Sequence, residues 1–252
     1  LDPWALGAGG IIGLLGIGLG SPGNPHILVR YMSAKEEDTL RRSGLVGTVW
    51  NVLMAWGAIY LGLAGRALVP PEKLPGGDPE NLYAMLAQAH FHPFLFGLVM
   101  AAVFAAIMST VDSQLLVISS GITRDIVQRF WPERFSERTM VALSRLVVLL
   151  VILVGLALGY WGRGSLIFWF VLLAWAGLGA AFGPPVILGL YWRGANGWGA
   201  LAGMLTGALT TFLWKFLGLS KLIYELVPGF LAGLLAVILV SLGTRNASLR
   251  GG

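Results

Sequence analysis

Long apolar stretches are the feature that most restricts how this chain can fold. Several runs of about 18 or more mostly apolar residues follow one another, and each could cross a bilayer as a helix. Charged residues make up only 12% of the chain, against about 25% in an average soluble domain. Because lipid offers the backbone no hydrogen bonds, each crossing segment must satisfy its own. The sequence therefore predicts an all-α integral membrane protein.

Proline, glycine and clusters of charge divide the chain into about seven candidate transmembrane helices. We interpret the whole chain, residues 1–252, as a single transmembrane domain that is incomplete. It begins with Leu1 and no signal-peptide pattern precedes the first apolar run, so we expect it to be the C-terminal part of a longer protein. The candidate helices cover residues 4–32, 43–69, 92–127, 139–161, 166–192, 197–217 and 223–243.

Basic residues are distributed unevenly over the loops that these helices define. One side would hold five, namely Arg66, Lys73, Arg163, Lys215 and Lys221. The other side would hold twelve, namely Arg30, Lys35, Arg41, Arg42, Arg124, Arg129, Arg134, Arg138, Arg145, Arg193, Arg245 and Arg250. Since basic loops favour the cytoplasm, we expect a multi-pass protein of the cell inner (plasma) membrane with a cytoplasmic C-terminus. This bias accounts for the net charge of +5 without a nucleic-acid partner.

The longest outer loop, residues 70–91, contains a segment that is typical of a short helix. Asp78 is suited to the N-cap and Pro79 to the first helical position. This helix could cover a transport path or simply pack against its neighbours. Glycines recur every four residues in two of the apolar runs, at Gly179 and Gly183 and from Gly199 to Gly207. That spacing favours close contact between helices in lipid.

A polar cluster interrupts the third apolar run in the sequence AAIMSTVDSQLL, residues 105–116. On a helix Ala106, Ser109, Thr110 and Ser113 share one face. Their hydroxyl and carbonyl oxygens suit a hard, weakly held cation. Alternatively, the hydroxyls only bond back to the preceding turn or to another helix. A carboxylate inside a span is by default a functional hypothesis, so we take Asp112 as support for a site but not as a ligand.

The first apolar run is broken at the sequence GLGSPGNPHI, residues 18–27. Pro22 and Pro25 each remove a backbone N–H and clash with the preceding turn, so a regular helix is not expected here. Irregular backbone at membrane depth occurs where protein or a watery cavity can satisfy it. Interrupted spans also indicate the binding site of a transporter. A simple kink is the alternative.

At these residues the chain resembles the sodium:solute symporter family, and most closely its bacterial proline-transporting members. The resemblance implies two inverted repeats of five helices with flanking helices, of which this chain would supply the C-terminal part. The N-terminal half of the same transporter would then be a partner. The matching segments follow the family's order over nearly the whole chain and read GNPHILVRYM, AAIMSTVDSQLLVISSGIT, AWAGLGAAFGP, GALAGMLTGALT and YELVPGF.

The resemblance also implies a function, which is sodium-coupled symport of a small organic solute across the bilayer. Proline or a related amino acid is the expected solute, sodium is the coupling ion, and no cofactor is expected. The implied sodium ligands are the Ala106 carbonyl and the Ser109 and Thr110 hydroxyls. Other sodium ligands in the family belong to a helix outside this chain.

The broken first helix of this chain corresponds to the part of the family that holds substrate, which implies Ile17, Ser21 and Pro25 as substrate-binding residues. Pro25 matches the family's proline at this position. The proline transporters of the family carry Trp and Tyr where this chain has Ile17 and Ser21. Two aromatic contacts are therefore replaced here, while the sodium motif shows no such departure.

Other functions predict other features. A symporter for a carboxylate, a sugar or a vitamin would keep the sodium motif and change the substrate contacts. A channel-like subunit would conduct sodium without solute, and a non-transporting fragment would do neither. An enzyme is not expected, because the spans carry no cluster of His, Asp and Glu at metal spacing and the chain has no cysteine.

Overall fold

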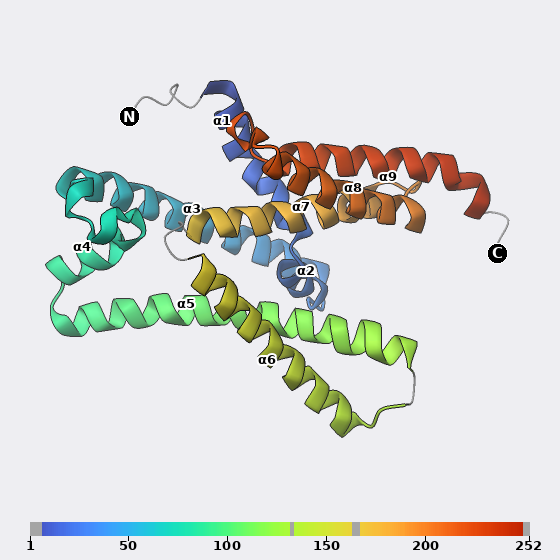
Figure 1. The fold of residues 1–252 in the computed structure, drawn as a ribbon, viewed down its shortest axis with the longest axis horizontal. Coiled ribbons are helices and arrows are strands. Elements are labelled where there is room, and N and C mark those ends of the chain that lie inside the picture. The colour runs from blue at the N-terminus through green and yellow to red at the C-terminus, as the bar shows by residue number, and fades with distance from the viewer. Residues whose placement is uncertain (1–6, 132–133, 163–166, 249–252) are drawn as a thin grey trace. The chain divides into compact units, whose positions relative to one another are not determined.

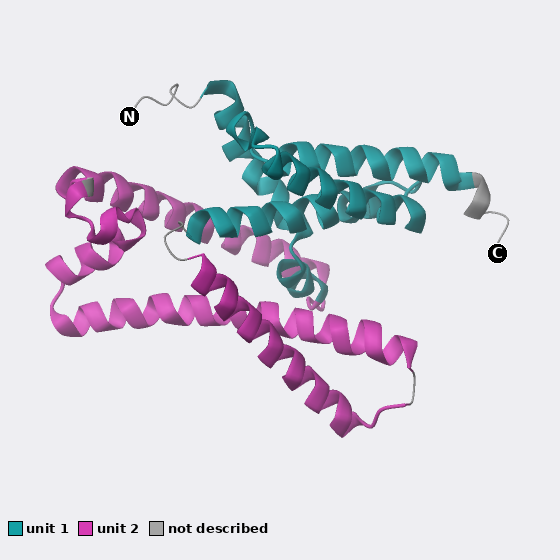
Figure 2. Ribbon diagram, in the orientation of Figure 1, with its two compact units in different colours: residues 1–32, 167–252 teal, residues 33–166 magenta. Residues whose placement is uncertain are grey.

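The computed structural model describes residues 7–131, 134–162 and 167–248, and these residues form helices joined by short turns (Figure 1). The predicted all-α class is confirmed. The chain divides into two compact units, residues 1–32 with 167–252 and residues 33–166 (Figure 2). The expected single transmembrane domain stays a prediction.

Unit 1 contains the broken first span and the last three long helices. Its elements are α1 (Gly7–Gly16), η2 (Ile17–Gly23), α2 (Pro25–Met32), α7 (Ile167–Tyr191), α8 (Gly197–Phe216), η7 (Leu219–Lys221) and α9 (Leu226–Ser248). Unit 2 contains the helices between them. Its elements are α3 (Glu37–Leu68), η3 (Pro71–Lys73), η4 (Pro75–Gly77), η5 (Pro79–Asn81), α4 (Leu82–His90), α5 (Pro93–Ser120), the π-helix η6 (Gly121–Gln128) and α6 (Glu137–Trp161).

Five helices in the described part of the chain are long and apolar enough to cross a membrane. They are α3, α5 together with η6, α6, α7 and α9. The broken first span forms shorter pieces, and α8 falls outside this group because glycines and threonines take the place of larger apolar residues. The number of seven crossings is thus not confirmed, although a helix forms in every predicted range.

Helix α3 begins at Glu37, six residues before the predicted start at residue 43. Glu37 and Asp38 lie in its first turn, where negative charge interacts favourably with the helix dipole. Arg42 then pairs with Asp38 one turn earlier at 3.7 Å. Charged residues that precede the predicted range therefore extend the helix beyond its apolar part.

The core of unit 1 lies where α7 packs against α9 and α8. Ala176 and Ala180 of α7 are fully buried beside Leu226 and Phe230 of α9. Side chains this small bring helix backbones close together, so the packing here depends on fit between main chains.

The glycines of α8 contact neighbouring helices, as their spacing predicted. A Cβ added to Gly199 would meet Ser241 of α9, and one added to Gly203 would meet Val237 of α9. A Cβ on Gly207 would meet the carbonyl of Ala180 in α7. All three glycines are buried.

Pro184, one of two prolines inside α7, explains why the Ala180 carbonyl needs close neighbours. Pro184 has no N–H and cannot donate to the Ala180 carbonyl four residues earlier. A Cβ on Gly233 of α9 would lie 3.0 Å from the same oxygen, so backbone from α8 and α9 surrounds it. Contacts from Cα–H groups are the weak bonds that a carbonyl receives in such a place.

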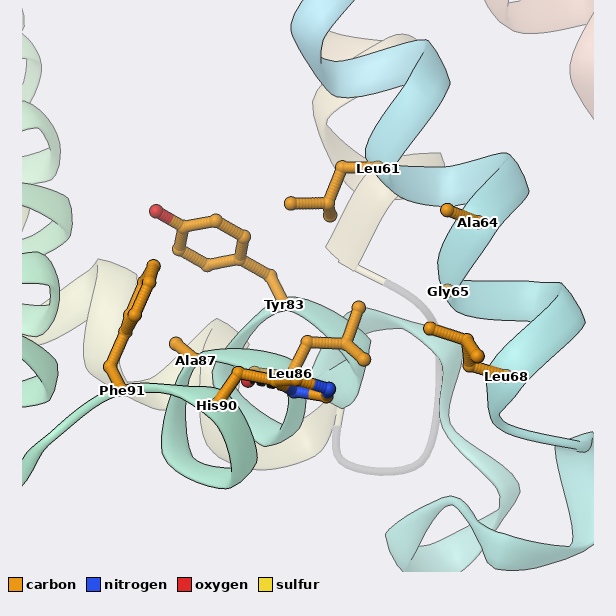
Figure 3. A pocket seen from close by; sticks show the side chains of 9 residues that line it. All are labelled: Leu61, Ala64, Gly65, Leu68, Tyr83, Leu86, Ala87, His90 and Phe91. Carbon is orange, nitrogen blue, oxygen red and sulfur yellow. Dashed lines mark hydrogen bonds between the residues drawn. The ribbon is translucent and has the colours of Figure 1, made fainter.

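In unit 2 the short helix of the long loop forms as predicted. Asp78 Oδ1 accepts a hydrogen bond of 2.9 Å from the Glu80 N–H and Pro79 opens the turn that leads into α4. Leu86 of α4 lies against α3 at Gly65, where an added Cβ would approach its Cδ1 to 2.9 Å. An apolar cavity of 270 Å³ lies between the two helices (Figure 3). The described contacts of α4 are packing contacts, and its role as a lid stays a hypothesis.

A partly buried chain of hydroxyls joins α5 and η6 to α6 in the same unit. Ser119 Oγ donates to the Ser144 carbonyl at 3.1 Å, and the Thr123 hydroxyl donates to the Ser119 carbonyl at 2.7 Å. Ser144 Oγ in turn donates to Thr123 Oγ1 at 3.3 Å. These bonds hold the start of the π-helix against α6.

The contact between the first span and α7 provides a test of this packing. A Cβ on Gly23 would lie 2.6 Å from the Gly179 Cα and 2.6 Å from the Leu178 carbonyl oxygen. Since backbone cannot rotate aside, we expect Gly23→Ala to destabilise the protein by about 1–3 kcal/mol. Thermal unfolding of the purified protein measures this.

Gly18→Ala is the matched control, because nothing lies within 4 Å of a Cβ built there. It should leave the unfolding temperature unchanged or raise it slightly. Equal unfolding temperatures for the two variants would contradict the packing described here.

Candidate functional site

The first span is interrupted where the prolines predicted it. Helix α1 ends at Gly16, a 3₁₀ turn runs over Ile17–Gly23, and Asn24 is extended with ψ of 113° before α2 begins at Pro25. The missing N–H groups of Pro22 and Pro25 leave carbonyls of the preceding turn without their helical partners. The prediction of an irregular segment in this span is confirmed.

Asn24 closes the break, and the sequence analysis did not single it out. Its side-chain Nδ2 donates a 2.7 Å hydrogen bond to the Gly20 carbonyl, in place of a backbone bond from residue i to i−4. Its own carbonyl accepts from the N–H groups of Ile27 and Leu28, which starts α2. Asn24 is only 2% exposed. An Asn directly before a proline is a recognisable cap signal.

The break is held against α7 by contacts at two glycines. The indole of Trp175 lies over Gly20, and its Nε1 donates a 2.9 Å hydrogen bond to the Ile17 carbonyl. Gly23 lies against the backbone of α7 at Gly179. Trp175 therefore satisfies one carbonyl of the broken turn and fixes the turn on α7.

The structure places the three expected substrate-binding residues on this one broken segment, four residues apart. Ile17 opens the 3₁₀ turn, Ser21 lies within it, and Pro25 begins α2; all three are partly exposed. Ile17 also lines a cavity of 520 Å³ within unit 1. The Ser21 carbonyl accepts from the Asn24 N–H at 3.3 Å.

The three expected sodium ligands lie together on α5 in unit 2. Ser109 Oγ donates to the Ala106 carbonyl oxygen at 2.9 Å, and Thr110 Oγ1 donates to the same oxygen at 3.2 Å. Ser113 Oγ donates to the Ser109 carbonyl at 2.8 Å. All three predicted ligands are exposed on the surface of unit 2. Three oxygens of two hydroxyls and one carbonyl thus converge at one point on the helix.

This arrangement is compatible with a cation site and also with hydroxyls that only bond to their own helix. Each hydroxyl oxygen keeps lone pairs after donating its hydrogen, so it can still face a cation. The same back-bond to the preceding turn also occurs at Thr48 of α3, whose Oγ1 donates to the Gly44 carbonyl at 2.7 Å. What distinguishes residues 106–110 is that two hydroxyls meet at one carbonyl.

Asp112, on the same helix, is exposed and makes no hydrogen bond or ion pair with the residues that the structure describes. Ser109 Oγ, one turn earlier, donates instead to the Ala106 carbonyl. The substrate-binding candidates belong to unit 1 and the sodium candidates to unit 2. Each group is therefore assembled within its own unit.

The family model and the similar proteins point to the same family. The chain matches the sodium:solute symporter family over residues 8–207. It is 43% identical to the high-affinity proline transporter PutP of Bacillus subtilis, over 95% of this chain and 50% of that protein. It is 41% identical to sodium/proline symporter 2 of Staphylococcus saprophyticus, over 94% of this chain and 48% of that protein.

A further relative is the osmoregulated proline transporter OpuE of Bacillus subtilis, 38% identical over 94% of this chain and 48% of its own length. The chain spans about half the length of the curated relatives it matches. No solved structure matches it significantly. The family match covers most of the chain and includes both the broken span and the Ser-Thr pair, so this multi-pass membrane protein belongs to the sodium:solute symporter family.

Proposed function

We propose that this chain takes part in sodium-coupled symport of a small organic solute, with proline or a related amino acid as that solute. The single observation that carries the proposal is the extended similarity to proteins named as proline transporters and sodium/proline symporters. The broken span and the hydroxyl cluster are the local features that such a function uses. The protein would act as a transporter and not as an enzyme, and it would need no cofactor besides the coupling ion.

The chain would act together with an N-terminal half of the same transporter. Support comes from coverage, because relatives about twice as long match this chain over nearly its whole length. A sodium site shared between helices of the two halves would be incomplete in this chain alone. The bilayer, sodium and the solute are its other partners, and no nucleic acid is among them.

In the proposed sodium site the Ala106 carbonyl and the hydroxyls of Ser109 and Thr110 are ligands. Neutral hard oxygens without a carboxylate bind a monovalent cation weakly, and weak binding allows release on the other side. The convergence of two hydroxyls on one carbonyl, at 2.9 and 3.2 Å, supports the assignment. Sodium would replace the hydrogen bonds that now join these oxygens.

In the proposed substrate site Ile17, Ser21 and Pro25 line the broken span. Carbonyls freed by the two prolines and the ends of α1 and α2 supply polar contacts that a regular helix would not. Sodium binding would favour the outward-open state, solute would then bind, and rocking of the helix bundle would release both inside. Coupling between the two binding sites is reciprocal. If sodium raises the affinity for solute by some factor, solute must raise the affinity for sodium by the same factor.

We further propose that the protein lies in the cell inner (plasma) membrane with its C-terminus in the cytoplasm. The support is the excess of Lys and Arg on one set of loops. In this orientation the junction of α8 and α9 faces outward.

The first prediction concerns the sodium ligands. Ser109→Ala or Thr110→Ala in the full-length transporter should raise the sodium concentration for half-maximal uptake about tenfold, as expected for the loss of one polar ligand. Solute affinity at saturating sodium should change much less. Uptake into proteoliposomes measured over a sodium series gives both values.

Thr48→Ala is the matched control, since Thr48 makes the same back-bond on α3 without a second hydroxyl. It should leave the sodium dependence unchanged. If both Ser109→Ala and Thr110→Ala behave like this control, their hydroxyls only stabilise the helix.

The second prediction concerns the solute. Labelled proline should enter proteoliposomes containing the full-length transporter when a sodium gradient is imposed, and a potassium gradient should not replace it. Uptake should saturate with proline, which a channel would not show. Sodium-dependent uptake of another solute but not of proline would keep the mechanism and assign a different substrate, in line with Ile17 and Ser21. Sodium flux without any solute from a panel would contradict symport.

A further inference from the structure

An open cavity of 520 Å³ lies in unit 1 and is lined by residues of that unit. Its walls come from α1, the start of α7, the end of α8, and the segment that leads through η7 into α9. Its lining runs from Lys221 at the helix ends to Ile17, where the first span breaks. The cavity therefore reaches the proposed substrate site.

An ion pair of unequal exposure forms part of this wall. The side chain of Glu225 is only 3% exposed, and its Oε1 lies 3.4 Å from Lys215 Nζ. The Lys215 side chain is 39% exposed, and its ammonium lies 5.9 Å from the centre of the Trp169 ring. Burying a carboxylate is unfavourable unless it is paired. Glu225 is thus a buried anion whose partner can reach solvent.

A second observation points to a ligand in the same wall. Ser220 lines the cavity, and its Oγ is buried without a hydrogen-bond partner among the residues that the structure describes. Buried hydroxyls are nearly always paired, because an unpaired one loses its bonds to water without replacement. Its neighbours do have partners, since the Tyr224 hydroxyl donates to the Leu172 carbonyl at 2.6 Å and Trp214 Nε1 donates to the Ile223 carbonyl at 3.1 Å.

We propose that this cavity is a binding site for a small zwitterion, of the amino-acid or imino-acid class, on the way to the broken span. The solute's ammonium would bind Glu225, and its carboxylate would bind Lys215 and the Ser220 hydroxyl. This inference rests on the proposed function and adds to it a second site for the same class of solute. It also assigns roles to residues that the sequence analysis did not select.

Charge balance explains why a zwitterion fits better than a simple ion. A lone cation would meet Lys215 and a lone anion would meet Glu225, so each would be repelled by one member of the pair. A zwitterion lets both members exchange their mutual contact for contacts with the solute. No buried charge is then left unpaired, which is the costly alternative.

The competing explanation is that the pair only joins the end of α8 to the start of α9. A structural pair would be restored by exchanging its charges in the double variant Lys215→Glu with Glu225→Lys. If the pair were only structural, adding solute would not change how fast a reagent reaches the cavity. The experiment therefore measures access.

The reporter is Leu222→Cys in a full-length transporter whose other cysteines have been replaced; this chain has none of its own. Leu222 lines the cavity and is 65% exposed. Leu217→Cys is the matched control, because Leu217 is 66% exposed and does not line the cavity. The rate of alkylation by a small uncharged maleimide is measured in sodium-free buffer with proline, its amide (a cation) or N-acetylproline (an anion).

We expect proline to slow alkylation at Leu222→Cys and not at Leu217→Cys, while the cation and the anion have little effect. Glu225→Gln should raise the half-protecting proline concentration about tenfold to a hundredfold, and Ser220→Ala should raise it less. Lys215→Arg, which keeps the charge, should preserve protection. The double charge exchange should abolish protection even where it restores thermal stability.

Protection that is unchanged in Glu225→Gln, or equal at both reporters, would overturn the proposal. So would the absence of protection in a preparation that takes up proline with sodium. Uptake is measured on the same preparation, so failure of the proposed function and failure of this second site give different results. A protein that takes up no proline but shows protection that depends on Glu225 would keep the site and lose the assignment of proline as the transported solute.

Discussion

Helices in lipid gain little from hydrophobic attraction, because the surrounding acyl chains are as apolar as their own side chains. Their association depends on how closely their backbones can approach. In unit 1 this approach occurs at glycines: Gly20 and Gly23 of the first span meet α7, and Gly207 of α8 meets the Ala180 carbonyl. The cavity, the break and the last three helices keep their places because these contacts leave no space for a Cβ.

The same unit shows how a polar backbone survives interruption. Prolines remove N–H groups in the first span and in α7, and neighbouring groups bond or closely contact other carbonyls of these interrupted stretches. The Asn24 side chain donates a hydrogen bond to the Gly20 carbonyl, and the Trp175 indole N–H donates one to the Ile17 carbonyl. Around the Ala180 carbonyl, the neighbours are backbone from two helices. The backbone of the irregular span is therefore held by neighbouring groups where a regular helix would use its own hydrogen bonds.

Much of this was predictable from local sequence. The proline and glycine content of residues 18–27 predicted the break, and the four-residue spacing of glycines predicted the contacts of α8. The early start of α3 was missed, because charged residues read as a loop also suit a first helical turn.

Lys215 and Glu225 were not selected either, since their pairing depends on the turn that brings the end of α8 back to the start of α9. Periodicity carries no information on such a turn. The sodium and substrate assignments come from family resemblance, and the structure adds the distances among their atoms.

The broken span has two kinds of position, glycines that pack against α7 and partly exposed residues on the same turn. Gly20 and Gly23 touch α7 through main chain, whereas Ile17 and Ser21 are partly exposed on the same turn. A side chain added at Gly20 or Gly23 would disturb this packing, whereas substitution at position 17 or 21 would change the exposed surface of the turn. The exposed side of the break can diverge while the glycine contacts behind it are kept.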